Sequence, residues 1–510
     1  MTGARLLPLD VTKEIRALLP TWLACTTTIG AAAIFTTGRA ITGVTQGTVL
    51  RVGILVYVFG CAALGALSIG HEYSNRTLPL LLSLPASRRR LFTVKLTVLT
   101  AMLLGLSVVA MAGVLEKLLR GGLSDAAVVG LLSFLGGLFL APWLTMVCRN
   151  PLAGAVFASV IAGSMLAIGE VVAVVTYGAP LAHSRDADGV KLAVASWGML
   201  MICAVAAVAS WRMFMRLEAI DGRDSHMRLP QWLRRPATIA APGAPRGRRV
   251  HPIWWLARKE LHLQALTFVV AGIYLVGWMA ILRRGAVVGG TLDQLTLDEP
   301  LSLWTVIFGG VQALLSGSLA SAEERQFGTL ESQVLLPMST AKQWAVKAGT
   351  ALGLTLVLAV GLPILLGYIS LPAEALRIDR WYVGLVIVLA AGSLYVSSLC
   401  SSGLQALMLS APMPLIVIVL FRVLSAAPYW GFAAFGTLTR SQGLSIERYQ
   451  WRLMPVVWVI FVAVALHLAF VNHRSSERGP LRIRRQAAWI AGSMALGVVV
   501  FAGAVSYLAG

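Results

Sequence analysis

Long, uninterrupted apolar runs constrain the fold of this chain more than any other feature. The runs Val49–Ile69, Leu96–Leu115, Ala126–Val147, Leu152–Tyr177 and Leu453–Val471 each approach or exceed the roughly 20 residues that a helix needs to cross a bilayer. They are continuous, whereas a strand that spans lipid must alternate. Composition agrees, because 13% of the 510 residues are charged against about 25% in a soluble domain. We therefore predict an all-α, polytopic membrane protein.

The order of the runs predicts two similar halves. We expect a first six-span repeat over residues 1–214, a linker over 215–250, a second six-span repeat over 251–472, and a basic segment with a thirteenth span over 473–510. The expected spans lie near 21–38, 50–70, 92–114, 126–148, 152–177 and 192–214, then near 265–282, 301–321, 348–370, 381–403, 405–426, 453–471 and 487–508.

The net charge of +20 has a simple explanation in a membrane protein. Basic residues concentrate in loops on the cytoplasmic side, and the largest cluster lies in the Arg-, Pro- and Gly-rich linker, including "RRPATIAAPGAPRGRRV". This pattern predicts a cytoplasmic N-terminus. No nucleic-acid partner is expected, because no folded domain is available to present these residues as a binding surface.

An internal repeat relates the two halves. Residues 71–95 read "HEYSNRTLPLLLSLPASRRRLFTVK" and residues 323–347 read "EERQFGTLESQVLLPMSTAKQWAVK". An offset of 252 positions pairs identical residues, such as Glu72 with Glu324 and Lys95 with Lys347, and continues without a gap through the fourth span to Cys148 and Cys400. Both copies have the same orientation because an even number of spans separates them. The sequence therefore predicts parallel repeats about an axis along the membrane normal.

The repeated segment resembles a motif of the ABC type 2 transporter permeases. In that family, an acidic residue at the end of the second span precedes Gly-Thr-Leu, a Leu-rich stretch, Leu-Pro-x-Ser and basic residues. The second copy has Gly328-Thr329-Leu330, while the first has Arg76 before Thr77. The resemblance implies a six-span core in each half, an amphipathic elbow helix before the first span, and a cytoplasmic coupling helix in this loop that contacts a separate ATPase.

The resemblance assigns coupling to the ATPase to matched residues in both loops. These are Glu72, Arg76, Thr77, Pro85, Ser87, Arg88, Arg89, Arg90, Glu324, Gly328, Thr329, Pro337, Ser339 and Lys342. The three consecutive arginines could instead anchor the third span at the lipid headgroups. The two glutamates are harder to explain in that way, because an isolated carboxylate beside a membrane is costly unless paired. We expect them to pair with basic residues of the coupling loop or of the partner.

Two further sets of charged residues carry predictions. Lys13-Glu14 and Lys259-Glu260 mark the expected elbow helices, although an ordinary helix start before a span would also fit. Glu170 in the fifth span aligns with Arg422 at the offset of 252. Because equivalent positions of parallel repeats meet if they face the axis, we predict a gate pair between the halves. The alternative is that each side chain reaches the outer headgroups separately.

The sequence lacks the residues that several functional classes of protein require. There is no G-x-x-x-x-G-K-[ST], so ATP and Mg²⁺ would be bound by partner subunits and this chain would carry no cofactor and no ATPase activity of its own. The seven histidines are scattered, and the five cysteines fall within apolar runs without C-x-x-C spacing, which predicts no metal site.

The function predicted from the sequence is that of a permease subunit of an ABC exporter in the bacterial inner membrane. Export follows from the resemblance. The partners would be two copies of an ABC ATPase, membrane lipid, and a small-molecule or lipid substrate that the apolar spans suggest is hydrophobic. Two alternatives are an ion-coupled secondary transporter of the parallel-repeat type and an intramembrane enzyme. The first would bury acidic residues near mid-membrane, and the second would need clustered polar residues at one face.

Overall fold

The computed structural model consists of helices throughout the part of the chain that it describes, and no strand occurs there. The described residues are 6–37, 44–74, 77, 87–112, 123–177, 185–216, 252–289, 294–327, 338–370, 378–420, 423–424, 440–474 and 480–509. The chain divides into two compact units, Met1–His251 (unit 1) and Pro252–Gly510 (unit 2). The predicted all-α class is confirmed.

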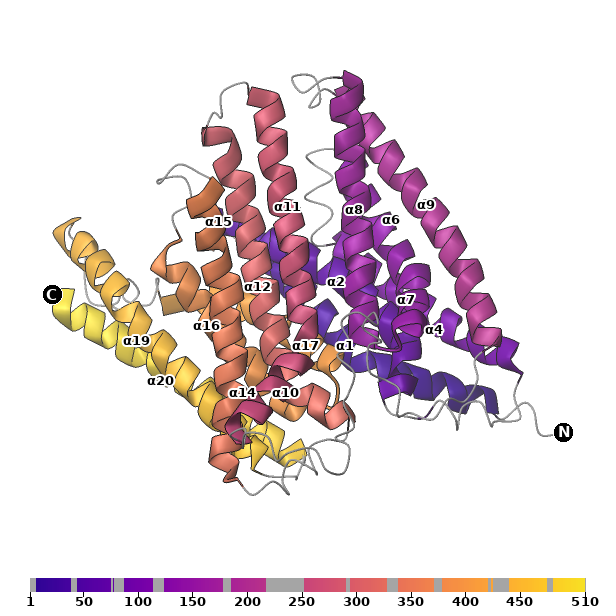
Figure 1. Cartoon of the computed structure of the whole chain (residues 1–510). Helices are drawn as coiled ribbons and strands as arrows, with labels where there is room; N and C mark the ends of the chain where they lie inside the picture. The colour runs from indigo at the N-terminus through magenta and orange to yellow at the C-terminus, as the bar shows by residue number, and fades with distance from the viewer. Residues whose placement is uncertain are drawn as a thin grey trace, which may run out of the picture. The chain divides into compact units, whose positions relative to one another are not determined.

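Unit 1 contains the N-terminal helices, drawn from indigo to magenta in Figure 1. Its helices are α1 (Leu6–Thr37), α2 (Val44–Ser74), α4 (Arg88–Ala110), α6 (Leu123–Leu135), the π-helical segment η2 (Gly136–Leu140), α7 (Ala141–Cys148), α8 (Pro151–Tyr177) and α9 (Arg185–Met215). The segments α6, η2 and α7 follow one another directly and form one span.

Unit 2 contains the remaining helices, from magenta to yellow in Figure 1. They are α10 (Pro252–Leu263), α11 (Ala265–Gly289), α12 (Gln294–Phe327), α14 (Thr340–Thr355), the π-helical segment η6 (Leu356–Gly361), α15 (Leu362–Ser370), α16 (Arg380–Leu399), α17 (Gly403–Ser410), α19 (Arg440–His473) and α20 (Pro480–Ala509). Residues 413–420 are also helical and follow α17 after a turn.

Among the described residues, twelve helices are long and apolar enough to cross a membrane, and the segment Pro151–Met165 of α8 is a shorter apolar helix. Five of the twelve lie in unit 1 and seven in unit 2. The last, Arg484–Val505, corresponds to the thirteenth span expected from the sequence. The chain is therefore a multi-pass membrane protein.

The two expected elbow helices differ in the structure. In unit 2, α10 ends at Leu263 and a turn at Gln264 separates it from α11. In unit 1 the expected elbow, Asp10–Leu19, and the first span form one helix, α1, which continues through Pro20. The prediction of a separate elbow helix in unit 1 is thus wrong, because no residue there interrupts the helix.

The central helix of each unit is α2 or α12, and small residues allow its neighbours to approach closely. Every residue from Gly60 to Glu72 of α2 is buried. A Cβ at Gly65 would overlap the carbonyl group of Gly137 in η2. At the equivalent position in unit 2, a Cβ at Gly317 would lie 2.6 Å from the carbonyl oxygen of Ala390. Close backbone packing through small residues is a common way for helices to associate in a membrane.

A tyrosine hydroxyl occupies the same interior site in both units. In unit 1, the Tyr57 hydroxyl donates to the carbonyl oxygen of Gly130 at 3.1 Å and lies 3.0 Å from the Ser107 hydroxyl. In unit 2, the Tyr382 hydroxyl donates to the carbonyl oxygen of Ala359 at 2.7 Å. Each hydroxyl therefore joins the second, third and fourth spans of its unit.

The tyrosine comes from a different helix in each unit. The offset of 252 pairs Tyr57 with Gly309 and Gly130 with Tyr382. The ring thus enters from the second span in unit 1 and from the fourth span in unit 2, and glycine stands opposite it each time. A Cβ at Gly309 would overlap the Tyr382 hydroxyl and lie 2.7 Å from its Cζ atom. This exchange extends the sequence register into the packing of the core and supports a common origin of the two units.

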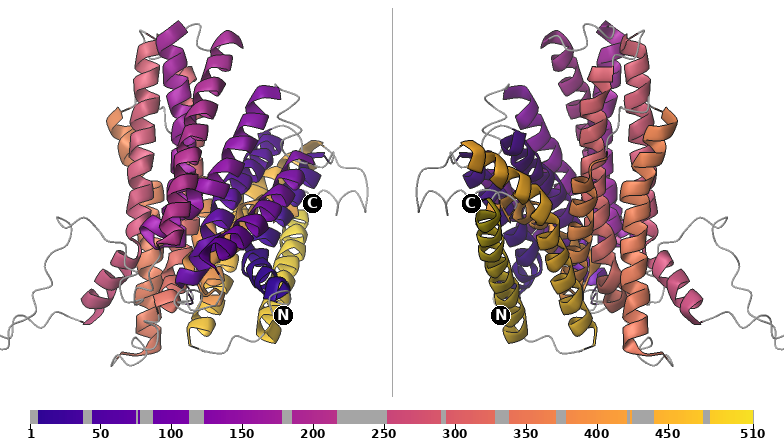
Figure 2. Two further views of the ribbon diagram at one scale, coloured as in Figure 1. Left: turned by 90° about the vertical axis from the view of Figure 1, so that its right-hand side faces the viewer. Right: turned by 90° about the vertical axis from the view of Figure 1, so that its left-hand side faces the viewer.

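Helix α20 is attached to the rest of unit 2 by a buried polar network. Figure 2 shows α19 and α20 side by side. The Gln486 amide donates to Asn472 Oδ1 at 2.7 Å, and the Asn472 amide donates to Gln486 Oε1 at 3.2 Å. Tyr395 donates to Gln486 Oε1 at 3.2 Å, and Asn472 donates to Ser398 Oγ at 2.9 Å. A side-chain amide that is buried in an apolar environment without a hydrogen bond raises the free energy of the folded state. This network therefore fixes the position of α20 on α16 and α19.

The tyrosine–glycine exchange predicts opposite outcomes for two adjacent glycines. Gly309→Ala is expected to lower the free energy of unfolding by about 1–3 kcal/mol, because the added methyl overlaps Tyr382 in a packed core. Gly310→Ala is the matched control, because a Cβ there meets nothing within 4 Å. Thermal unfolding of the purified protein in detergent measures both. The double variant Gly309→Tyr/Tyr382→Gly should recover most of the stability that Gly309→Tyr loses, and equal losses in both would contradict the exchange.

The amide network predicts a non-additive pair of substitutions. Gln486→Leu should destabilise unit 2 by about 1–3 kcal/mol, because the buried Asn472 amide loses its partner. The double variant Asn472→Leu/Gln486→Leu should cost less than that single change, because both polar groups leave together. The measurement is again thermal unfolding in detergent. A double variant that loses more stability than the two single variants together would refute the pairing.

Candidate functional site

The largest group of buried charges in unit 1 lies where α2 leads into the loop 75–86. We call the residues Lys13, Glu14, His71, Glu72 and Lys95 cluster 1. They come from three helices, α1, α2 and α4. Glu72 is fully buried, and Glu14 and Lys95 are each 4% exposed. Such burial requires each charge to have a partner, because an uncompensated buried charge costs several kcal/mol.

Lysines from the two flanking helices neutralise the carboxylates of cluster 1. Lys95 Nζ donates to Glu14 Oε1 at 2.6 Å and lies 3.4 Å from Glu72 Oε1. Lys13 Nζ donates to Glu72 Oε1 at 2.9 Å. His71 Nε2 lies 3.1 Å from the same oxygen. Glu72 is thus linked to α1 through Lys13 and to α4 through Lys95, and Lys95 also links α4 directly to α1.

Unit 2 contains an equivalent group, Lys259, Glu260, Glu324 and Lys347, which we call cluster 2. Lys259 and Lys347 each donate to the Glu324 carboxylate, one to Oε1 and the other to Oε2. The residues come from α10, α12 and α14. Glu324 and its counterpart Glu72 are both fully buried.

The partners of the two glutamates differ from those expected from the sequence. Glu72 and Glu324 do pair with basic residues, but these are Lys13 and Lys259 of the elbow segments and Lys95 and Lys347 of the third spans. The expectation was a partner in the coupling loop or in another subunit. The geometry explains the difference, because each glutamate projects from a central helix and is enclosed by its two neighbours.

Cluster 1 also has the composition of a metal site, because ligand atoms of Glu14, His71 and Glu72 lie within 4.8 Å of one another. Lysine ammonium groups, however, already lie where a divalent cation would bind these carboxylates. Lys95 Nζ is 2.6 Å from Glu14 and Lys13 Nζ is 2.9 Å from Glu72. The donor set therefore fits an ion cluster of lysines and carboxylates better than a metal centre.

Glu260 differs from its counterpart Glu14. Its Oε1 atom lies 3.9 Å from Lys259 Nζ and has no hydrogen-bond partner within the described residues. Burial, against the opposing effect of Lys347 and together with the neighbouring Glu324 carboxylate, raises the pKa of the Glu260 carboxyl to about 8. Glu14 Oε2 also has no hydrogen-bond partner within the described residues, but Glu14 Oε1 accepts a direct hydrogen bond from Lys95.

The loop after α2 is bonded to cluster 1 at its first residues. The backbone N–H of Thr77 donates to the carbonyl oxygen of Glu72 at 3.0 Å, and the Thr77 hydroxyl donates to Glu72 Oε2. At the far end of each loop, a serine begins the third span. Ser87 Oγ accepts from the N–H of Arg90, and Ser339 Oγ accepts from the N–H of Lys342, each at 3.4 Å. Both serines are thus helix N-caps.

The arginine run at the start of α4 is only partly available to a partner. Arg88 donates from Nη1 to the carbonyl oxygen of Met215, the last residue of α9, at 2.5 Å. Arg89 is exposed and Arg90 is half-buried. In unit 2, Lys342 is exposed. There the end of α19 is capped by α20, because Arg482 donates to the carbonyl oxygen of Val471 at 3.2 Å.

Some predicted site residues lie outside the described residues. These are Arg76, Pro85, Gly328, Thr329, Pro337 and Arg422. Glu170 lies in α8, but its side chain is also outside what the structure describes. The predicted gate pair of Glu170 and Arg422 therefore stays a prediction.

The sequence analysis missed the role of four residues that complete the clusters. Lys95 and Lys347 were recognised only as matching positions, and Lys13 and Lys259 only as elbow residues. A signal was present, because a lysine kept in register inside an apolar run needs a buried acid as its partner. The Asn472–Gln486 pair gave no comparable signal, because α20 has no counterpart in the first half.

The clusters predict unequal effects for two lysines that contact the same carboxylate. Lys95→Met should lower the free energy of unfolding by about 3–5 kcal/mol, because it leaves buried carboxylates without their cation. Lys13→Met should cost about 0–1 kcal/mol, because the Lys13 side chain is 49% exposed. Thermal unfolding in detergent at neutral pH compares the two variants. Similar losses for both would show that burial does not set the strength of these contacts.

Comparison with known proteins adds one finding to this geometry. Residues 16–178 match the family model described as the ABC-2 family transporter protein. The matched region includes His71, Glu72 and Lys95 of cluster 1. No curated protein and no solved structure matches the chain. The family match supports an ABC-2 permease, which is the transmembrane subunit of an ABC transporter and works with separate ATPase subunits.

Proposed function

We propose that this chain is the membrane-spanning permease of an ABC exporter, with both permease units fused in one polypeptide. Two copies of an ABC ATPase would bind ATP and Mg²⁺ and dock from the cytoplasm on the loops 75–86 and 328–338. The chain would lie in the inner membrane with its N-terminus in the cytoplasm. The family match over unit 1 and the related ion cluster in unit 2 support this proposal.

The observation that carries the proposal is the position of the two clusters at the beginning of the two loops. Glu72 is bonded both to Thr77 of the loop and to lysines of α1 and α4. A displacement of the loop by an ATPase would therefore act on three helices together. Coupling between distant sites needs such a contiguous element with more than one arrangement, and the cluster is well placed to transmit the force.

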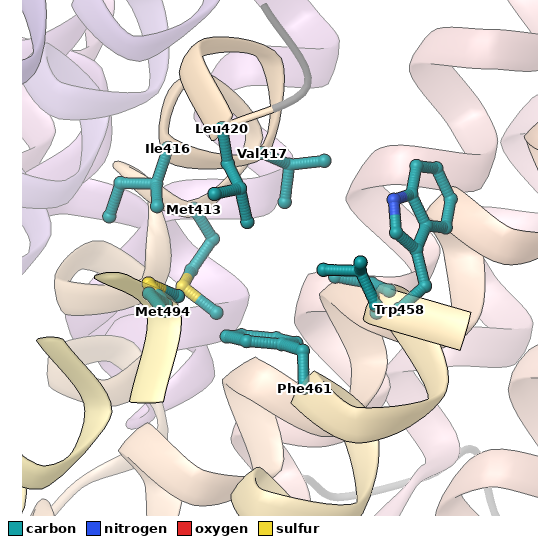
Figure 3. A pocket seen from close by; sticks show the side chains of 9 residues that line it. Met413, Ile416, Val417, Leu420, Trp458, Phe461 and Met494 are labelled. Carbon is teal, nitrogen blue, oxygen red and sulfur yellow. The ribbon is translucent and has the colours of Figure 1, made fainter. Parts of the chain in front are cut away.

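The proposed substrate is hydrophobic. Within unit 2, an apolar pocket lies between α16, the helical residues 403–420, α19 and α20 (Figure 3). In this view the Met413 and Met494 side chains overlap, the Phe461 ring lies beside them, and the Trp458 indole lies on the opposite side. Its lining consists of Val388, Met413, Ile416, Val417, Leu420, Val457, Trp458, Phe461 and Met494. Thioether and aromatic side chains adapt to varied apolar surfaces, and the apolar lining agrees with the proposed hydrophobic substrate.

The proposal is tested by capture of ATPase subunits with the full-length chain in mild detergent, followed by ATP hydrolysis and transport assays in liposomes. We expect vanadate-sensitive hydrolysis. Glu72→Gln and Glu324→Gln should keep the ATPase bound but lower transport on the order of tenfold, because they weaken the coupling between loop and spans. Asp188→Asn is a matched control, because Asp188 is an exposed carboxylate paired with Lys191 at 3.1 Å away from the clusters.

Two results would count against the proposal. If no ATPase is captured and transport follows an ion gradient instead, the chain is a secondary transporter. If an ATPase is captured but both glutamine variants transport at the rate of the Asp188→Asn control, the clusters are structural and do not carry the coupling.

A further inference from the structure

We propose that Glu260 and Glu324 of cluster 2 form a proton-binding site that holds α10 on α12, and that cluster 1 contains no such site. In this site one proton resides on Glu260 and the carboxyl O–H donates to the Glu324 carboxylate. When the proton leaves for solvent water, two adjacent buried carboxylates remain. Their repulsion weakens the attachment of α10, whereas the equivalent segment of α1 stays bound.

The positions of the lysines distinguish the two clusters. In cluster 1, Lys95 Nζ bridges both carboxylates, at 2.6 Å from Glu14 and 3.4 Å from Glu72. In cluster 2, Lys347 donates to Glu324, and Glu260 Oε1 is left with Lys259 Nζ at 3.9 Å, beyond hydrogen-bonding distance. Glu260 is 1% exposed, so water does not replace the missing donor.

At one position of the repeat the two units differ, and cluster 2 has no histidine there. The offset of 252 pairs His71 with Glu323. His71 Nε2 lies 3.8 Å from Glu14 Oε2 and 3.1 Å from Glu72 Oε1. Glu323 is instead a third carboxyl in unit 2, 7% exposed. Cluster 2 therefore lacks the basic side chain that lies beside both carboxylates in cluster 1.

Two further ionisable side chains of the described residues, Arg325 and His473, lie near cluster 2. Arg325 of α12 donates from Nη1 to the carbonyl oxygens of Ser398 and Cys400. His473 at the end of α19 interacts electrostatically with Lys347 and Glu324. The groups that act on Glu260 itself are Lys259, Glu324 and Lys347. Adjacent carboxyls of this kind share a proton, because two like charges in contact cannot both ionise without a large cost.

The site makes the two units respond differently to pH. Because the pKa of Glu260 is raised in the folded protein, to about 8 from 4.5, the folded state binds this proton more tightly than the unfolded chain does. The stabilisation is therefore full below 4.5 and is lost as the pH rises through about 8.

Matched glutamine variants of the full-length protein test the proposal by thermal unfolding in detergent as a function of pH. Glutamine mimics a protonated glutamate. Glu260→Gln should unfold at the wild-type temperature at pH values well below 8, and at a higher temperature than the wild type above 8. Glu14→Gln should unfold at a lower temperature than the wild type in both pH ranges, because Lys95 loses an anionic partner. If Glu260→Gln loses as much as Glu14→Gln below pH 8, or if its pH curve runs parallel to that of the wild type, the proposal is wrong.

Infrared spectroscopy provides a second measurement that keeps Glu260 in place and so does not depend on whether the Glu260→Gln variant folds. In a Glu323→Gln background, the carbonyl stretch of a protonated buried carboxyl should be present below pH 8 and disappear above it. The absence of this band at the lower pH overturns the proposal. Neither measurement involves an ATPase or a transported substrate, so a failure here leaves the proposed transport function untouched.

Discussion

A fully buried glutamate at the end of a central helix sets the arrangement of each unit. Glu72 and Glu324 have no exposed surface, so each needs cations brought to it by other parts of the chain. In unit 1, these cations are Lys13 from α1 and Lys95 from α4. A carboxylate that pairs with lysines from two different helices holds those helices in one position relative to each other. The interaction therefore does more than stabilise the unit, because it connects the loop that follows α2 to the segments on both sides.

The two units differ locally in the residues and helices that make equivalent contacts. The end of α9 is capped by Arg88 at the start of α4, whereas the end of α19 is capped by Arg482 of α20. The interior tyrosine enters from the second span in one unit and from the fourth in the other. The elbow is continuous with the first span in unit 1 and is a separate helix, α10, in unit 2. The two units thus contain similar interactions, while the residues that make them differ.

The sequence predicted the all-α, multi-span class, because long apolar runs are a strong signal. It also identified Glu72 and Glu324 as residues that need partners. It did not identify Lys95 and Lys347 as those partners, because residues 23 positions apart in sequence meet only through the packing of two antiparallel spans. The Asn472–Gln486 pair was beyond sequence reasoning for a similar reason, since it depends on how α20 packs against α19. A separate elbow in unit 1 was predicted from amphipathic composition, which does not show where a helix breaks.

The central claim of this account is that a buried ion cluster transmits movement of a coupling loop to the helices around it. The most direct measurement is the distance between spin labels at two exposed positions, His262 on α10 and Lys342 on α14, in the ATPase complex with and without trapped nucleotide. The account predicts a change in this distance on trapping, and predicts that Glu324→Gln abolishes the change while ATP hydrolysis continues. The same change in the variant as in the unsubstituted protein would contradict it.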